Sequence, residues 1–368
     1  MPQAATEIDV SVIVPARNEE ANLAGCLHTL VGQDGISYEV IVVDDHSTDR
    51  TSEIAESFAV RVIMADPLPE GWSGKCNAAW SGAKIAKGKW LLFTDADTRH
   101  SSVSIVRGVQ EATEQRSDLL SYSPRQEVHG FAEHALMPVI FAELARTYRP
   151  REVRDPNSAV AAANGQYLLI RRKAYDAIGG HAAVAQAILE DVELARLVKQ
   201  AGYRLWFQQS AVVSTRMYRS LPQMWEGWTK NLALLFPNPR WLALRRSVEF
   251  LLISVCILAV FNSALERDPT GLLVNGLLVT MFLLFFYRRI RLAHFEGRSN
   301  ILAFFGLPLF ALLLLNSYIS HKGGTIRWKG RRYGSRGRNR LMAGHAAGTP
   351  FQESQGVGDH NKSGFLEG

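Results

Sequence analysis

VSVIVPARNEE, at residues 10–20, is a short apolar run that passes directly into a charged turn. Three comparable runs follow, and we predict strands at Val10–Val14, Glu39–Val43, Arg61–Met64 and Trp90–Thr94. Stretches with helical spacing separate these runs. The pattern is typical of βαβ units, so it predicts a mostly parallel sheet flanked by helices.

The helices between these strands are predicted at Glu20–Val31, Arg50–Phe58 and Lys75–Lys87, with Gly88 as the C-cap of the last one. We expect one α/β domain over residues 8–240. The 368 residues are 47% hydrophobic and 21% charged, which excludes a disordered or fibrous chain.

A membrane domain is predicted at residues 247–320. Its three apolar stretches, Ser247–Leu265, Gly271–Tyr287 and Ile301–Ile319, each have about the length that crosses a hydrocarbon core of roughly 30 Å. Glu266–Thr270 leaves room only for a tight hairpin. We therefore expect a multi-pass protein of the cell (inner) membrane.

Arginines beside the first two stretches place the large domain in the cytoplasm, because positive residues favour that side. They are Arg240, Arg245, Arg246, Arg288, Arg289 and Arg291. Three full crossings would leave the basic segment at 321–341 outside. Either the charge rule fails there or one stretch is re-entrant or interfacial, and Gly306 and Pro308 make the third stretch the candidate.

Eight lysines and arginines and no acidic residue lie between His321 and Arg340, and they account for the net charge of +6. Because this segment follows an apolar stretch, we predict contact with anionic lipid headgroups and not with nucleic acid. Residues 342–368 are mostly small and polar, and we expect them to be disordered. Phe131–Arg146 is apolar on one face, which fits a core helix and a membrane-surface helix equally.

Acidic residues follow two of the predicted strands. Asp44 and Asp45 come after the second, and Asp95 and Asp97 after the fourth. The carboxyl ends of parallel strands share one edge, where ligands bind. Residues i and i+2 of extended backbone point the same way, so Asp95 and Asp97 can hold Mg²⁺ or Mn²⁺ and leave its other face to a diphosphate.

Other nucleotide sites fit less well. No G-x-G-x-x-G follows the first strand, which counts against a dinucleotide oxidoreductase. Residues 71–76, GWSGKC, are too short for a phosphate loop and lack its Ser or Thr. Lys75 can still meet an anion at the start of its helix.

Together, the motifs resemble family 2 glycosyltransferases with the GT-A fold. They are VIVPARNEE at 12–20, VVDDHSTD at 42–49, TDAD at 94–97 and LEDVEL at 189–194. LPEGWSGK at 68–75, the apolar stretches and RWKGR at 327–331 resemble the membrane branch that glycosylates lipids. That branch includes ceramide glucosyltransferases and hopanoid- and carotenoid-associated enzymes.

The resemblance implies a nucleotide-sugar donor, with UDP expected, and an inverting reaction. The implied donor-binding residues are Pro15, Asn18, Glu19, Asp44, Asp45, Lys75 and Asp95. Asp97, with Asp95, would hold the metal on the diphosphate. Asp191 would be the general base that takes a proton from the acceptor, with Glu190 beside it.

The acceptor and phosphate side is expected further along the chain. Arg216 and Arg219 are candidates for the diphosphate. Many relatives carry Q-x-x-R-W here, whereas residues 223–231 read QMWEGWTKN and lack that arginine. Processive polymerisation is therefore not favoured. Gln223 and Trp225 remain candidates, and Trp228 is either an acceptor-side ring or an interfacial tryptophan.

The sequence thus predicts a membrane-anchored, inverting glycosyltransferase that moves one sugar to a lipid hydroxyl or carboxylate. The acceptor would be sphingolipid-, carotenoid- or hopanoid-like, at the cytoplasmic leaflet. A polyprenyl-phosphate glycosyltransferase is the nearest alternative. A processive polysaccharide synthase, a lipid nucleotidyltransferase and a non-catalytic lipid-binding protein follow.

Overall fold

The computed structural model describes residues 7–328 and 331–333. Residues 329–330 and 334–341 of the basic segment and the tail at 342–368 lie outside the described residues, and so do the predictions made for them.

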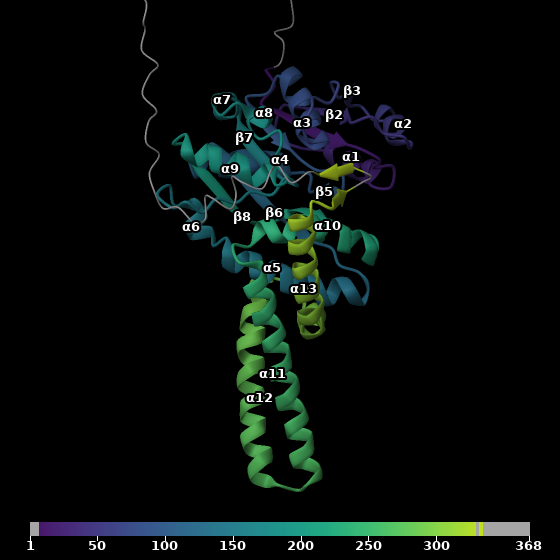
Figure 1. Cartoon of the computed structure of the whole chain (residues 1–368). Helices are drawn as coiled ribbons and strands as arrows, with labels where there is room; N and C mark the ends of the chain where they lie inside the picture. Colours follow the sequence, from purple (N-terminus) through teal and green to yellow (C-terminus); the bar gives the residue numbers. More distant parts are fainter. Residues whose placement is uncertain (1–6, 329–330, 334–368) are drawn as a thin grey trace, which may run out of the picture.

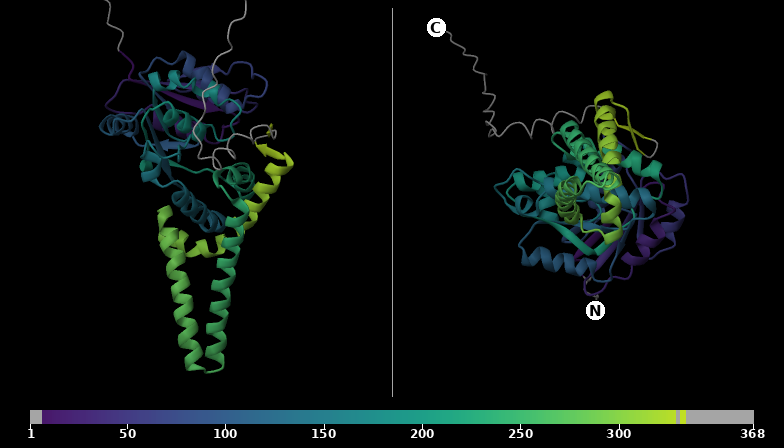
Figure 2. Two further views of the ribbon diagram at one scale, coloured as in Figure 1. Left: turned by 60° about the vertical axis from the view of Figure 1, so that its left-hand side comes forward. Right: turned by 90° about the horizontal axis from the view of Figure 1, so that it is seen from below.

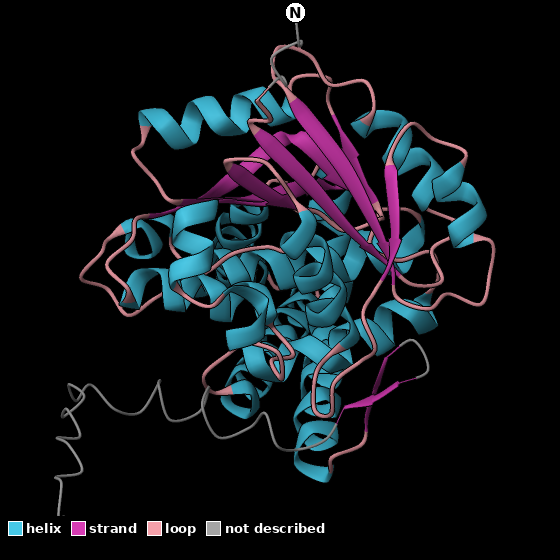
Figure 3. Cartoon of the chain, turned by 90° about the horizontal axis from the view of Figure 1, so that it is seen from above, coloured by secondary structure: helices cyan, strands magenta, loops and turns pink. Residues whose placement is uncertain are grey.

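An eight-stranded sheet in the order β3-β2-β1-β4-β7-β6-β8-β5 forms the centre of the large domain (Figures 1 and 3). Its strands are β1 (Val10–Ala16), β2 (Tyr38–Asp44), β3 (Arg61–Met64), β4 (Trp90–Phe93), β5 (Thr98–His100), β6 (Leu119–Gln126), β7 (Leu168–Arg171) and β8 (Leu205–Thr215). The four predicted strands are present and mutually parallel. β7 is antiparallel to both its neighbours and β5 to β8, so the sheet as a whole is mixed.

Helices cover both faces of the sheet (Figure 3). The helices before the apolar ones are α1 (Leu23–Leu30), α2 (Thr51–Glu56), α3 (Gly74–Ile85), α4 (Ser104–Glu114), α5 (Gly130–Thr147), α6 (Pro150–Arg154), α7 (Arg172–Ala177), α8 (Gly180–Ala183), α9 (Glu190–Gln200) and α10 (Leu221–Leu235), of which α5 and α10 pack with the apolar helices. Alternate residues of β1 enter opposite cores: Val12 and Val14 pack with α1, and Ile13 packs with α3. The predicted fold class, an α/β sheet domain followed by apolar helices, is confirmed.

The predicted role of Gly88 is wrong. Helix α3 ends earlier, and its C-cap is Ala86. Gly88 instead approaches the backbone of β1, where its N–H donates to Ser11 Oγ at 2.7 Å. A Cβ here would lie only 2.7 Å from the carbonyl carbon of Val10, so close backbone contact explains the glycine.

Three helices of the described chain are long and apolar enough to cross a membrane: α11 (Pro239–Leu265), α12 (Pro269–Ile290) and α13 (Gly297–Gly323). Only residues 266–268 separate α11 from α12, as predicted for a tight hairpin, and the two form a long antiparallel pair that projects from the sheet domain (Figure 1). A short 3₁₀ turn, η1 (Arg291–Ala293), leads to α13. Helix α5 lies between the sheet domain and α13, with residues 135–143 buried, and is therefore a core helix.

A buried charge cluster joins the hairpin to α5. Glu143 of α5 lies 3.2 Å from Arg246 Nε and 3.1 Å from Arg289 Nε, and Glu249 lies 2.7 Å from Arg289 Nη1. Arg246 and Arg289, which were among the arginines taken to place the large domain in the cytoplasm, are thus paired with glutamates inside the protein. Removing one member would leave an uncompensated buried charge, so the cluster fixes where the hairpin leaves the sheet domain.

Gly306→Ala should destabilise the detergent-solubilised protein by about 2 kcal/mol, because a Cβ at this point of α13 would overlap the carbonyl oxygen of Ala135 in α5. Denaturant unfolding measures the change. Gly276→Ala in α12 is the matched control, since a Cβ there meets nothing within 4 Å and alanine favours a helix. Equal stability of the two variants would contradict this packing.

Candidate active site

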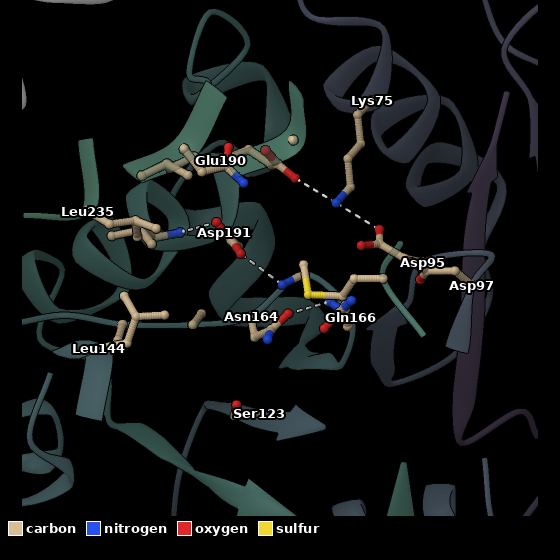
Figure 4. Close-up of a pocket in the computed structure, with 18 of the residues that line it drawn as sticks. Lys75, Asp95, Asp97, Ser123, Leu144, Asn164, Gln166, Glu190, Asp191 and Leu235 are labelled. Atoms are coloured by element: carbon tan, nitrogen blue, oxygen red, sulfur yellow. Dashed lines mark hydrogen bonds and ion pairs between the residues drawn. The ribbon is translucent and has the colours of Figure 1, made fainter. Parts of the chain in front are cut away.

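One cavity of about 620 Å³ opens at the carboxyl ends of β1, β2 and β4 and reaches α5 and α10 (Figure 4). Asp45, Asp97 and Asp191 all line it, although they are far apart in the chain. The convergence of these three carboxylates, on which the enzymatic interpretation depends, is therefore present.

Lys75 holds two of the acidic groups together. It lies in the first turn of α3, where Ser73 Oγ caps the helix by accepting from the N–H of Cys76. Its Nζ is 2.7 Å from Asp95 Oδ1 and 2.9 Å from Glu190 Oε1 (Figure 4). Burial disfavours the ammonium, but the charges of Asp95 and Glu190 outweigh it and hold the pKa of Lys75 well above its usual value.

Asp191 is the carboxylate whose proton affinity stands out. Its Oδ2 accepts from the N–H of Gly165 and its Oδ1 from that of Val192, both at 2.8 Å. Burial, followed by the negative charge of Glu190, raises the pKa of Asp191 to about 6. Burial alone would raise the pKa of Glu190, but the positive charges of Lys75 and then Lys230 outweigh burial and lower it. Near neutral pH Glu190 is thus an anion, and Asp191 can exchange a proton.

A divalent cation fits the donor set at Asp95 and Asp97. Both carboxylates line the cavity, and one oxygen of Asp97 is buried. Within the described residues no three His, Cys, Asp or Glu side chains could hold a metal by themselves. Two carboxylate oxygens suit Mg²⁺ or Mn²⁺ when phosphate oxygens supply further ligands.

Some of the residues predicted to bind a nucleotide line the polar end of the cavity, and others do not. Pro15, Glu19 and Asp45 line it. Asn18 and Asp44 are outside the lining and shape the loops instead. Asn18, in a left-handed conformation with φ of 50°, accepts from the N–H of Thr48 at 2.9 Å, and Asp44 accepts from that of Ser47 at 3.1 Å.

Several predicted acceptor-side residues also point elsewhere. Arg219 donates to Asn22 Oδ1 at 2.7 Å and to the carbonyl of Ala21, on the surface, and Gln223 accepts from its N–H. Arg216 and Trp225 are not among the cavity residues either. The cations that line the described cavity are Arg17, Lys75 and Lys230.

Apolar side chains form the far end of the cavity, next to the base of the hairpin. They are Phe141, Leu144, Leu235 and Leu292. Trp228 lines the same end, is 3% exposed, and packs against the rings of Phe141 and Tyr218. It is therefore a wall of the cavity and not a ring exposed at a membrane surface.

Sequence reasoning missed several lining residues: Tyr148, Asn164, Gln166, Lys230 and Asn231. Lys230 had a usable signal, because it is the only lysine or arginine in helix α10. Burial disfavours its ammonium and lowers the pKa of Lys230, and the negative charge of Glu190 opposes this shift with a smaller effect. Asn231 is its neighbour in α10, whereas Tyr148 caps the end of α5 and Asn164 and Gln166 lie in a loop, where no spacing marks them.

Residues 11–179 match the family model described as Glycosyl transferase family 2. The 4,4'-diaponeurosporenoate glycosyltransferase of Staphylococcus aureus (strain USA300) is 26% identical over 336 residues, which cover 88% of each chain. Among solved structures, the mannosyltransferase PcManGT from Pyrobaculum calidifontis, in complex with GDP-Man and Mn²⁺, is 16% identical with a TM-score of 0.49 and covers 85% of this chain and 86% of its own. Glucosyl-3-phosphoglycerate synthase from Mycobacterium tuberculosis is 19% identical with a TM-score of 0.40, covering 61% and 77%. The family match confirms the resemblance carried by the motifs.

Lys75→Met should lower the thermal midpoint at pH 7, because Asp95 and Glu190 lose the cation between them. Folding lowers the pKa of Glu190 below its value of about 4.3 in the unfolded chain. The stabilisation by Lys75 is therefore fully present above about pH 4.3, and it is lost as the pH falls through the pKa of Glu190 in the folded protein. The deficit relative to wild type should therefore shrink below about pH 4.3. Lys84→Met, which breaks a half-exposed pair with Asp66, is the control and should change stability by at most about 0.5 kcal/mol. A deficit that is independent of pH would argue against the charge bridge.

Proposed function

From the match of residues 11–179 to the family model described as Glycosyl transferase family 2, we propose that the protein transfers one sugar from a nucleotide-sugar to a carotenoid-type lipid, with inversion at the sugar carbon. We place it in the cell (inner) membrane with residues 8–240 in the cytoplasm. One observation carries the proposal: a single cavity joins the carboxylates at the strand ends to an apolar end beside the hairpin.

The donor would occupy the polar end of the cavity. Pro15, Glu19 and Asp45 would contact the nucleoside, for which uridine is our expectation, and the diphosphate would lie beside Asp95 and Asp97. A Mg²⁺ or Mn²⁺ ion held there would neutralise the charge that develops on the leaving diphosphate.

Lys75 has a second role in this scheme. When a cation and a diphosphate occupy the site, its ammonium already lies within ion-pair distance of Asp95 and Glu190 and needs no rearrangement to balance their charges. Such preorganisation is the main source of electrostatic stabilisation in enzymes.

Asp191 would act as the general base. It would accept the proton of an acceptor hydroxyl as that oxygen bonds to the sugar carbon and the bond from this carbon to the diphosphate breaks. The hydrogen bonds from Gly165 and Val192 fix the carboxylate at the start of α9.

The acceptor would enter from the apolar end. Its lining, including Phe141, Leu144 and Leu292, suits a polyene or another hydrocarbon chain, and the base of the hairpin is where such a molecule would leave a bilayer. The similarity to a glycosyltransferase named for a carotenoid acid supports this acceptor class over a sphingolipid or a hopanoid.

Asp97→Asn and Asp191→Asn should each lower transfer by at least about 10²-fold, because one loses a metal ligand and the other the base. Mass spectrometry of lipid extracts measures the result: a hexose-sized mass increase on one lipid class in cells with the wild type, and none with either variant. Asp176→Asn, on the exposed side of α7, is the matched control and should retain wild-type transfer. Wild-type product in both site variants would refute the assignment, whereas activity retained only in Asp191→Asn would indicate an acceptor that is already anionic, such as a carboxylate or a phosphate.

The rate should also depend on pH through Asp191. With its pKa near 6, kcat/KM should rise about fivefold between pH 5 and 6 and level off by pH 7.5, because only the ionised carboxylate accepts a proton. In Glu190→Gln the rising limb should move to lower pH, since the charge of Glu190 is one cause of the raised pKa. An unmoved limb in that variant would assign the titration to another group.

A further inference from the structure

Helix α13 starts at the base of the hairpin and not beside its full length. Its Phe304 packs against Phe250 of α11 at 5.0 Å and Phe286 of α12 at 6.3 Å between ring centroids, and both partners lie toward the sheet-domain end of their helices. Ser299 hydrogen-bonds to His134 of α5 at 2.8 Å. The first half of α13 therefore lies across α5.

The second half of α13 leads back to the sheet domain. Ser317 Oγ accepts from the N–H of Ala233 at 2.9 Å and donates to the carbonyl of Thr229 at 2.6 Å, both in α10. One turn later, His321 Nε2 lies 2.7 Å from the carbonyl oxygen of Lys230. The C-terminal end of α13 is thus held against the helix that lines the cavity, and the strand β9 (Ile326–Trp328) that follows also contacts α10.

Both ends of α13 are consequently on the sheet-domain side of the molecule. The turn between α11 and α12 is at the opposite end of the hairpin, far from every part of α13 (Figures 1 and 2). Of the most apolar part of α13, 44% is buried inside the protein, compared with 17% for α11 and 6% for α12. A helix held in this way does not run alongside the hairpin across a bilayer.

The outer face of α13 is apolar. Ile301, Phe305, Leu312 and Ile319 are 51–65% exposed, and their spacing places them in one stripe along the helix. The exposed Phe131 of α5 extends this stripe through its ring contact with Phe305, 6.0 Å between centroids. Phe305, near the start of this stripe, follows Phe304, which packs against Phe250 at the base of the hairpin, so the same hydrocarbon phase would cover this part of the stripe and the hairpin.

We propose that α11 and α12 are the two membrane crossings, and that α13 does not cross: its first half lies at the surface of the leaflet nearest the sheet domain, with Ile301 and Phe305 in the hydrocarbon, and its second half returns to α10 (Figures 1 and 2). The basic segment at 321–341 then stays on the same side as the sheet domain. This arrangement removes the conflict between three crossings and the positive-inside rule. It goes beyond the proposed function, and its test does not use enzymatic activity.

Single cysteines at exposed positions test this arrangement in the full chain, after Cys256 is replaced by serine; Cys26 and Cys76 are buried. Ser102→Cys reports the sheet domain, Arg267→Cys the tip of the hairpin, and Thr325→Cys the end of α13. With a membrane-impermeant maleimide, Thr325→Cys should label together with Ser102→Cys in inside-out vesicles, at least tenfold more than in intact spheroplasts. Arg267→Cys should show the opposite preference.

Labelling of Thr325→Cys from the same side as Arg267→Cys would establish a third crossing and overturn the proposal, as would labelling of all three positions from one side. A fluorescent protein fused to the C-terminus of the unsubstituted chain gives a second measurement. It should fluoresce, because the cytoplasm allows its folding, whereas a dark fusion of full-length protein in the membrane would place the C-terminus outside.

Discussion

The site depends on one electrostatic constraint: carboxylates brought together from strand ends and from a helix start need a cation between them. Lys75 supplies it, within 3 Å of both Asp95 and Glu190. Burial, and then the negative charge of its neighbour Glu190, make Asp191 retain its proton more strongly than an isolated aspartate would. The ion pair of one lysine thus links the donor half of the cavity to the group that would deprotonate the acceptor.

The parts of this site that the sequence predicted are those with a local signal. Asp95 and Asp97 follow a buried strand, and the rule that ligands bind at the carboxyl ends of parallel strands was sufficient to place them. Arg216 and Arg219, which were matched to a diphosphate by charge alone, do not line the cavity, because the sequence did not indicate which way the chain turns after β8. The predicted C-cap role of Gly88 was wrong for a related reason. A glycine after a helix suggests a cap, but here close contact with the backbone of β1, which is remote in sequence, requires a residue without a side chain.

Helix α5 connects the chemistry to the hairpin. One of its faces supplies Phe141 and Leu144 to the apolar end of the cavity, and Glu143, between them in sequence, binds Arg246 and Arg289 at the hairpin base. A buried charge cluster contributes little to net stability but is intolerant of rearrangement. The cavity mouth and the two hairpin helices are therefore held in one fixed relation, which the apolar pattern of Phe131–Arg146 alone did not reveal.

Helix α13 completes this relation from the other side. It braces α10 through Ser317 and His321, directly behind Trp228 and Lys230, which line the cavity. Hydropathy alone made α13 equivalent to α11 and α12, since hydropathy measures how apolar a helix is and not what covers it. The tertiary contacts separate them: two helices expose their apolar surface on most sides, whereas α13 exposes a stripe. The protein would then meet the bilayer with the start of α13 as well as with the hairpin, and Leu292, between α12 and α13, lines the apolar end of the cavity.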